Sequence, residues 1–460
     1  MNYLVQFLSV LNQKEVEKLK QIELKGKENV LLSTLLQYKK QNVPRDIILE
    51  KLQMTESHFY KSCSILLDKC YAFLFNHPFE TLKFLSKRDL YQNLKHEIFQ
   101  LEKSYSSDLK FNLLAFELLQ RGSYKNHEEK IIHHFAENIM SITKNEENFI
   151  PGIEYFLEIR RIRSKIFEYA AQQKNMEAEQ LKTRLEEIRK ELNFENHGLA
   201  LFHWYHAVYN YNHLFGDINE NPIEFLENAL KASQTALNYL DFEDILNTRC
   251  KIAENLYYES KFEDSYKHYS QIAQESPEIF FEDFYHLTKY VQVLLILNHL
   301  EQAEKILDEH FLNYLHIMHP TRGTMSAINY TKLFLLQKNY SEAHIAIQKA
   351  RFLNDKNFYL PYEYEIRLLE ITLAFLENFD ANYFSSAVKK HYKYFKTKGL
   401  KLGESNYVNY LYFIEQVAKS NASAKKFEWK PKLKSIYKTF QAGSYAVYGK
   451  LLDLCLQKNE

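Results

Sequence analysis

The sequence predicts an all-α fold: an α-solenoid of antiparallel helix pairs with a small N-terminal helical domain and a C-terminal capping region. Most windows place apolar residues at i, i+3, i+4 and i+7, as in DLKFNLLAFELLQ at 108–120, and few alternate strictly. The 460 residues include only ten glycines and eight prolines, which leaves few positions for tight turns or phosphate-binding loops. This composition favours helices joined by short connections over doubly wound α/β folds, whose first turn is rich in glycine.

Prolines and changes of pattern divide the chain into segments. NHPFE at 76–80 and NFIPG at 148–152 interrupt the helical pattern, because proline ends one helix and suits the first turn of the next. We expect an N-terminal helical domain at 1–77, degenerate helix pairs at 78–245, regular repeats at 246–400 and a basic helical cap at 401–460.

Residues 48–69, ILEKLQMTESHFYKSCSILLDK, have the outline of a helix-turn-helix. A short apolar helix is followed by a break at Gln53-Met54, and Thr55 can cap a second helix. A helix that reads DNA normally carries cationic residues, whereas residues 55–69 contain two lysines and two acids. The residues that could contact nucleic acid are His58, Tyr60, Lys61 and Ser62. Two helices packed for stability explain the pattern without DNA and are the favoured interpretation, while DNA reading stays open.

Four segments of the second half align with one another without gaps. They are AENLYYESKFEDSYKHYSQI from 253, VQVLLILNHLEQAEKILDEH from 291, TKLFLLQKNYSEAHIAIQKA from 331 and EITLAFLENFDANYFSSAVK from 370. The copies start 38, 40 and 39 residues apart, which corresponds to one helix pair per repeat. The tenth place of each copy is large and apolar, and the place three further on holds Ser265, Ala303, Ala343 or, as an exception, Asn382.

This pattern resembles the tetratricopeptide repeat family over residues 251–390. In that family an aromatic residue after the turn is followed by a small residue three positions later and by an apolar residue four after that. Tyr340, Ala343, Ile347 and Ala350 meet this pattern, as do Leu300, Ala303 and Leu307. The period here is longer than the family's ~34 residues. Where the family often has a turn glycine, this chain has Ser260, Asn298, Lys338 and Glu377.

The resemblance implies a concave face lined by the first helix of each pair. The family's groove positions fall on Glu254, Tyr258, Gln292, Lys332 and Arg367. We therefore expect a non-enzymatic scaffold that binds a protein or peptide in this groove. The residues do not match the clamp that some members use for a C-terminal carboxylate, and each can also be an ordinary solvated position.

The end of the chain is strongly basic although the whole chain is balanced at 59 basic and 59 acidic residues. From Ser385 onward there are fifteen lysines and five acids, and ASAKKFEWKPKLKSIYKTF at 422–440 mixes lysines with aromatic residues. Such a segment can contact phosphates while its aromatic rings stack on bases, or it can be a docked capping helix with its lysines in water. The candidates for phosphate contact are Lys425, Lys426 and Lys430. The sequence leaves open whether this tail fills the groove in cis.

Patterns for catalysis, cofactors and metals are weak. His203, His206 and His213 share one helix face, but His213 is too far along the helix to bind the same ion, and no cysteine or acid completes a set. Glycine-framed serines and nucleotide-binding motifs are missing, so we expect no catalytic residue, cofactor or metal. The four cysteines suggest buried thiols in a cytoplasmic protein, and no apolar run is long enough to cross a membrane.

Two functions remain. The first is the protein-binding scaffold. The alternative is a DNA-binding transcriptional regulator, in which the N-terminal helix-turn-helix reads DNA and the repeats form a sensor or dimerisation body. Nucleic acid is the less favoured partner because the candidate reading helix has no net charge.

Overall fold

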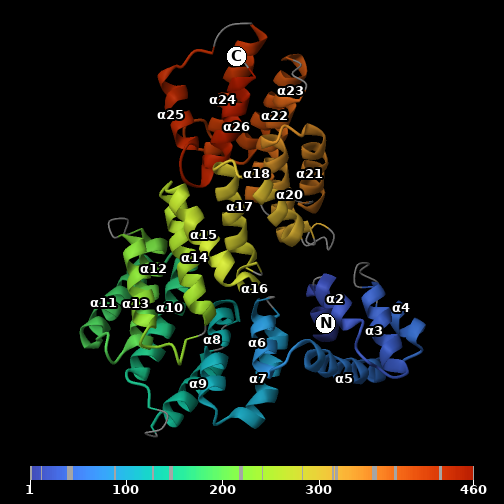
Figure 1. Ribbon diagram of the computed structural model, residues 1–460, viewed down its shortest axis with the longest axis vertical. Coiled ribbons are helices and arrows are strands. Elements are labelled where there is room, and N and C mark those ends of the chain that lie inside the picture. The colour runs from blue at the N-terminus through green and yellow to red at the C-terminus, as the bar shows by residue number, and fades with distance from the viewer. Residues whose placement is uncertain are drawn as a thin grey trace. The chain divides into compact units, whose positions relative to one another are not determined.

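The computed structural model is all-α, as the apolar periodicity predicted, and the described residues contain no strand (Figure 1). The structure describes residues 3–11, 13–38, 45–87, 90–126, 129–144, 149–216, 221–240, 242–281, 283–312, 315, 320–354, 360–377, 381–423 and 427–458. Within these ranges no helix combines the length and the apolar character needed to span a bilayer.

The chain forms two compact units, Met1–Phe242 and Glu243–Glu460. The helices of unit 1 are α1 (Tyr3–Val10), α2 (Gln13–Leu19), α3 (Lys27–Tyr38), α4 (Arg45–Leu52), α5 (Glu56–Leu74), α6 (Pro78–Lys87), α7 (Tyr91–Tyr105), α8 (Leu109–Asn126), α9 (Glu129–Ile142), α10 (Ile153–Gln172), α11 (Asn175–Glu191), α12 (Gly198–Phe215) and α13 (Pro222–Ser233).

The first five helices of unit 1 pack around α5. Helices α1, α2 and α3 contact α5, and α3 also contacts α4. The break between α4 and α5 lies where the sequence placed it, because Gln53 has a left-handed backbone with φ of 49°. The side chain of Thr55 accepts a hydrogen bond from the backbone N–H of His58, which confirms the predicted N-cap.

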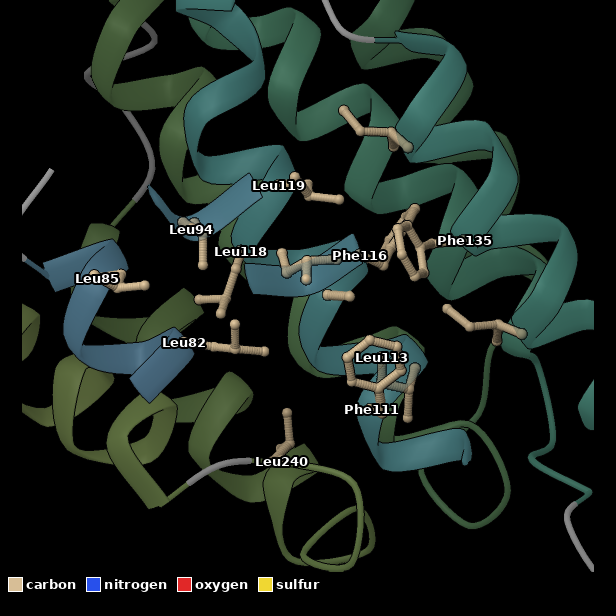
Figure 2. Close-up of a cluster of buried hydrophobic side chains, with 14 of the residues drawn as sticks. Leu82, Leu85, Leu94, Phe111, Leu113, Phe116, Leu118, Leu119, Phe135 and Leu240 are labelled. Carbon is tan, nitrogen blue, oxygen red and sulfur yellow. The ribbon is translucent and has the colours of Figure 1, made fainter. Parts of the chain in front are cut away.

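The remaining helices of unit 1 stack as successive pairs. Helices α6, α8, α10 and α12 each contact the next in this series, and α7, α9, α11 and α13 each pack against the helix that precedes them. Figure 2 shows part of the resulting core, which includes Leu82 and Leu85 of α6, Phe111 and Phe116 of α8, and Leu240. These side chains are buried because the apolar positions of each helix recur on one face.

Unit 2 continues with helices of similar length. They are α14 (Phe242–Tyr258), α15 (Phe262–Glu275), α16 (Pro277–Phe280), α17 (Phe284–Ile296), α18 (Leu300–Ile306), the π-helical turn η2 (Leu307–Phe311), α20 (Pro320–Leu336), α21 (Tyr340–Leu353), α22 (Leu360–Leu376), α23 (Ala381–Thr397), α24 (Asn406–Ala422), α25 (Pro431–Phe440), the 3₁₀ turn η4 (Gly443–Tyr445) and α26 (Ala446–Gln457).

The helices of unit 2 fall into two series. We call α14, α17, α20, α22 and α24 the first helices, and α15, α18, α21, α23 and α25 the second helices. From α17 on, each first helix contacts the next first helix and the second helix that follows it, and α15, α18, α21 and α23 each pack against the following first helix. This arrangement repeats through the unit.

Three turns between first and second helices share one geometry. Ser260, Asn298 and Lys338 have left-handed backbones, with φ of 65°, 64° and 60°. At each turn the left-handed residue donates its N–H to the carbonyl three residues earlier, and the next N–H reaches back five residues, as in a Schellman motif. The three residues that occupy the expected glycine positions therefore adopt the conformation that glycine favours.

Small residues lie where two helices cross closely. Ser265, Ala303 and Ala343 are completely buried, and Ser265 Oγ donates a hydrogen bond of 2.7 Å to the carbonyl of Ala253 in the preceding helix. A larger side chain would force the two backbones apart, which explains the recurrence of a small residue three positions after each turn aromatic. The fourth copy cannot be compared, since Phe379 and the Asn382 side chain lie outside the described residues.

Candidate functional site

The first helices of unit 2 carry a continuous series of polar and aromatic side chains, which we call the polar row. It comprises Glu254, Tyr257 and Tyr258 of α14, Tyr285, Lys289 and Gln292 of α17, Lys332 of α20 and Glu365 of α22. Four of its positions, Glu254, Tyr258, Gln292 and Lys332, were predicted groove residues. Gln292 accepts a 2.9 Å hydrogen bond from Tyr257 Oη. Its charged members are the lysines Lys289 and Lys332 in the middle of the row and the acids Glu254 and Glu365 on either side of them.

One end of the polar row is open to solvent. Tyr258 and Tyr285 are 41% and 52% exposed, whereas Glu254 beneath them is buried. Glu254 Oε1 accepts a hydrogen bond of 3.0 Å from Tyr258 Oη and a second one from Tyr285 Oη. The buried carboxylate thus fixes the positions of two exposed aromatic rings.

Lys289 lies among the same tyrosines. Its Nζ donates a 2.9 Å hydrogen bond to Tyr258 Oη and lies 4.9 Å from the centre of that ring, with the rings of Tyr257 and Tyr285 each 5.5 Å away. An ammonium group is attracted to the faces of aromatic rings. Burial lowers the pKa of Lys289, and the nearby carboxylates of Glu254 and Glu365 oppose that shift.

The other end of the row is covered. Lys332 is only 3% exposed, and its Nζ forms an ion pair of 2.8 Å with Glu365 Oε2. Tyr448 of α26 donates a 2.8 Å hydrogen bond to the same oxygen, and Lys332 Nζ lies 4.9 Å from the centre of the Tyr448 ring. Burial alone would raise the pKa of Glu365, but the ion pair and the hydrogen bonds from Lys332 and Tyr448 lower it.

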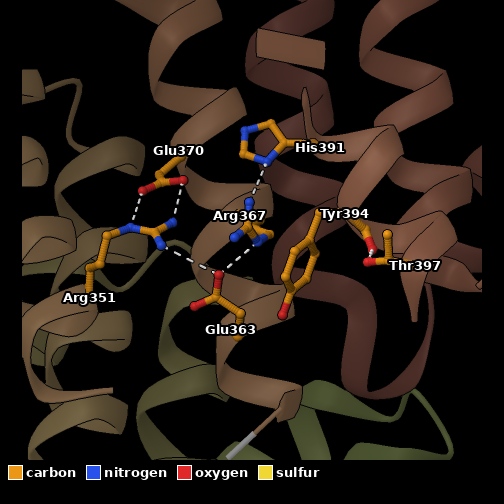
Figure 3. Close-up of polar contacts among 7 residues, drawn as sticks. All are labelled: Arg351, Glu363, Arg367, Glu370, His391, Tyr394 and Thr397. Carbon is orange, nitrogen blue, oxygen red and sulfur yellow. Dashed lines mark hydrogen bonds and ion pairs between the residues drawn. The ribbon is translucent and has the colours of Figure 1, made fainter. Parts of the chain in front are cut away.

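Arg367 lies in a different cluster, which joins α21, α22 and α23 (Figure 3). Its Nε is 2.7 Å from Glu363 Oε1, and its guanidinium lies 3.6 Å from the centre of the Tyr394 ring. Arg351 contacts the same Glu363 oxygen at 3.4 Å and binds Glu370 with two nitrogens, at 2.7 and 2.6 Å.

A histidine completes this second cluster. His391 Nδ1 is 3.5 Å from Arg367 Nη1, and burial together with Arg367, Arg351 and Lys390 lowers the pKa of His391 to about 4. His391 is therefore neutral at neutral pH. Arg367 contacts Glu363 of its own helix and Tyr394 and His391 of α23, so it lies apart from the polar row.

The residues of α5 that could contact nucleic acid are exposed, but few positive charges lie near them. His58, Tyr60 and Lys61 lie on the solvent side of the helix. Lys69, the other lysine of α5, is bound to Glu28 of α3 at 2.7 Å. Its charge is therefore already offset within the protein.

The basic tail has a docked apolar side. Leu433, Ile436 and Phe440 of α25 are buried, while Lys430 and the lysines of α25 face solvent. Trp429 packs against Phe413, Phe427 and Tyr437. Lys425 and Lys426 lie outside the described residues. The arrangement found is the one expected of an amphipathic helix docked on its neighbours.

The histidine segment of unit 1 is packed inside the protein. His203 and His206 are buried, and His203 Nε2 is 3.5 Å from Glu117 Oε1, whereas His213 is exposed. Among the described residues no group of three or more histidine, cysteine or acidic side chains is arranged to hold a metal ion. All four cysteines are buried and unbridged.

Unit 1 also contains an open cleft of about 850 Å³, lined mainly by α6, α8 and residues 237–240. Glu117 reaches its wall and is 3.9 Å from Arg160 Nε. The wall mixes apolar side chains with charges of both signs, Lys83 and Lys110 against Asp108 and Glu117. The cleft therefore indicates no single class of ligand.

Sequence reasoning missed Tyr285, Lys289, Glu365 and Tyr448. The spacing of four residues between Tyr285 and Lys289, like that between Glu254 and Tyr258, would have indicated one helix face. Tyr448 is separated from Glu365 by 83 residues, and no local pattern joins them.

Comparison with models of known protein families found no match, and comparison with curated proteins found no relative. The observations on this chain itself therefore define its class: an all-α protein with paired helices and a polar, aromatic row across its first helices.

Proposed function

We propose that the chain is a non-enzymatic interaction scaffold, a tetratricopeptide-like solenoid that binds a protein or peptide through the first helices of unit 2. The repeated order of helix contacts, the three equivalent left-handed turns and the buried small residues support the solenoid. In such a stack the first helices form one face, and that face carries the polar row.

The observation that carries the binding proposal is the pair of exposed tyrosines held by Glu254. Exposed aromatic residues contribute strongly to protein interfaces because they bury a large area and have few rotatable bonds. Tyr258 and Tyr285 have their hydroxyl groups fixed by hydrogen bonds before any partner arrives. Little conformational entropy would be lost on binding.

Affinity capture from the native host tests this proposal. We expect a partner to be retained by the wild-type protein and lost, at least tenfold, from the double variant Tyr258→Ala/Tyr285→Ala. Tyr383→Ala is the matched control, because Tyr383 is 67% exposed but belongs to the second helix α23. Equal recovery with all three proteins would contradict the proposal.

A second variant separates binding from folding. Tyr258→Phe/Tyr285→Phe keeps both rings and removes their hydrogen bonds to Glu254. We expect partial retention of the partner, since the aromatic area remains but its positioning is weaker. Circular dichroism and thermal unfolding of each variant show whether unit 2 is intact.

DNA binding by unit 1 is the second candidate, and the turn at Gln53 followed by the capped helix α5 favours it. Fluorescence anisotropy with random duplex DNA at low salt is the test. Salt-sensitive binding at micromolar protein that is lost in Lys61→Ala would support DNA binding by the helix-turn-helix segment. No binding under these conditions would reject it, because phosphate contacts are strongest at low salt.

A further inference from the structure

The charge of the second helices of unit 2 changes along the series. Helix α15 carries three acids and one lysine, α18 two acids and one lysine, and α21 one acid, one lysine and one arginine. In contrast, α23 carries four lysines and α25 three, and neither contains an acid. Because the second helices occupy equivalent places in the repeated order of contacts, solubility alone does not explain why the last two carry charge of one sign.

The lysines of α25 lie in line on its solvent side. Lys430, Lys434 and Lys438 are exposed and follow one another at intervals of four residues, which places them along one side of the helix about 6 Å apart. Lys430 is the N-cap residue, and the N–H of Lys434 donates a 3.0 Å hydrogen bond to its carbonyl. Helix α25 packs against α24 and α26, and α26 packs in turn against α17, α20, α22 and α24. We call the three lysines the basic stripe.

The basic stripe is not neutralised within the protein. Among the residues that the structure describes, none of its three lysines forms an ion pair. Each neighbouring helix of α25 carries one acid, and both acids have other partners. Glu415 of α24 forms an ion pair of 2.7 Å with Lys419, and Asp453 of α26 accepts a hydrogen bond from Tyr437. The stripe therefore leaves three positive charges in solvent.

An exposed tryptophan lies at the start of the basic stripe. Trp429 directly precedes Lys430 and is 42% exposed. Its ring packs against those of Phe413, Phe427 and Tyr437, with centroid distances of 5.9, 5.2 and 5.1 Å. A ring that its neighbours already hold can stack on a base with little further loss of conformational freedom.

We propose that the basic stripe and Trp429 bind a single-stranded nucleic acid, with phosphates on the lysines and a base on the tryptophan ring. The lysines attract any polyanion, and the exposed ring selects among polyanions because stacking needs unpaired bases. An acidic peptide has no bases, and an anionic bilayer would take up the apolar side of α25, which is buried in the protein. This surface belongs to a second helix, so the inference goes beyond the proposed scaffold function.

Fluorescence anisotropy with the full-length protein at low salt provides the test. The probe is a fluorescein-labelled oligothymidylate of about twelve nucleotides, within the usual range of single-strand site sizes. We expect binding at micromolar protein that is weakened at least tenfold in Lys430→Gln/Lys434→Gln/Lys438→Gln. The slope of log affinity against log salt should also become less steep by about 2, because each phosphate contact of a single strand contributes about 0.7. No binding by the wild type would overturn the inference.

A matched control removes the same charge from the other second helices. Lys267→Gln/Lys305→Gln/Lys349→Gln changes one lysine each in α15, α18 and α21, and should bind the strand as the wild type does. Equal weakening by both triple variants would mean that net charge attracts the strand, and would reject the stripe. Glu428→Gln removes the exposed acid next to Trp429 and should strengthen binding.

The emission of Trp429 reports stacking without any change at the site. In a Trp204→Phe background Trp429 is the single tryptophan, and a base stacked on its ring quenches its fluorescence. We expect quenching that saturates together with the anisotropy. Binding without quenching would reject the stacking contact. Equally tight binding of polyglutamate, or of the duplex that the probe forms with its complement, would overturn the choice of a single strand.

Lys61→Ala separates this surface from the candidate DNA contact of unit 1. Binding that is lost in Lys61→Ala but kept in the triple variant of the basic stripe would place the strand on α5 and reject the inference. Partner capture through Tyr258 and Tyr285 depends on neither result, so the scaffold proposal is tested independently.

Discussion

Tyr448 donates a 2.8 Å hydrogen bond to Glu365, and this contact joins the last helix of the chain to the polar row of the first helices. The same carboxylate oxygen is paired with Lys332. The Glu365 carboxylate therefore links α20, α22 and α26. The groups bonded to it determine how much a substitution at this site lowers the free energy of unfolding.

Replacing only one partner of the Lys332–Glu365 pair is expected to destabilise unit 2. Lys332→Met removes the cation and leaves the half-buried Glu365 without its partner, which should lower the free energy of unfolding of unit 2 by about 3 kcal/mol. The double variant Lys332→Met/Glu365→Gln should recover most of this loss, because glutamine carries no charge and can still accept the hydrogen bond from Tyr448.

Intrinsic fluorescence can follow each unit separately. The chain has two tryptophans, Trp204 in unit 1 and Trp429 in unit 2, so urea unfolding in a Trp204→Phe background reports unit 2. We attribute the lower stability of Lys332→Met to the Glu365 carboxylate that is left without its cation. A double variant that is less stable than Lys332→Met alone would contradict this explanation.

Lys338→Gly is expected to stabilise unit 2. Lys338 is exposed and has φ of 60°, a conformation that costs an ordinary residue roughly 1 kcal/mol and costs glycine little. The gain should appear as an increase of about 0.5 to 1 kcal/mol in the urea unfolding of unit 2, because glycine also adds entropy to the unfolded chain. Lys338→Ala keeps a Cβ and should not stabilise; a gain of the same size would point to the lost charge instead.

His391 should make unit 2 less stable as the pH falls. Its folded pKa of about 4 lies below its ordinary value of 6.5, so the unfolded chain binds more protons between these limits. The stability is fully present above pH 6.5 and is lost on acidification towards pH 4, by up to about 3 kcal/mol. The groups that oppose protonation are Arg367, Arg351 and Lys390.

His391→Gln provides the comparison, since glutamine does not titrate in this range. Urea unfolding of both proteins between pH 4 and 7, followed through Trp429, should show a steeper loss for the wild type. Parallel curves would mean that another group causes the acid sensitivity.

Glu97 of α7 should make unit 1 less stable as the pH rises. Burial, with a smaller contribution from Asp68, raises the pKa of Glu97 to about 7, so the folded state holds its proton more tightly than the unfolded state. Stability should be fully present below pH 4.5 and should fall as the pH rises through 7, by on the order of 2 kcal/mol after allowance for solvent screening.

Glu97→Gln should remove this loss and make unit 1 more stable than the wild type at pH 8. Trp204 fluorescence in a Trp429→Phe background follows unit 1 alone. Lower stability of Glu97→Gln at pH 8 would show that the ionised carboxylate has a favourable contact.

The sequence by itself determined the helical class and the local details of the repeats. The capped start of α5 at Thr55, the turns at Ser260, Asn298 and Lys338, and the buried small residues Ser265, Ala303 and Ala343 were all indicated by local patterns. These features depend on hydrogen bonds and side-chain spacing within one helix pair, and a stretch of about 40 residues contains that information.

The tertiary structure alone decided which polar groups meet and what covers them. Tyr448 reaches Glu365 across 83 residues of sequence, Lys289 lies among tyrosines from two helices, and Arg367 is engaged by Glu363 and Tyr394. Each of these outcomes depends on how separate amphipathic helices pack, and many such helices with similar apolar faces could have occupied the same position. Only the complete set of long-range contacts selects α26 as the helix that lies on the first-helix face.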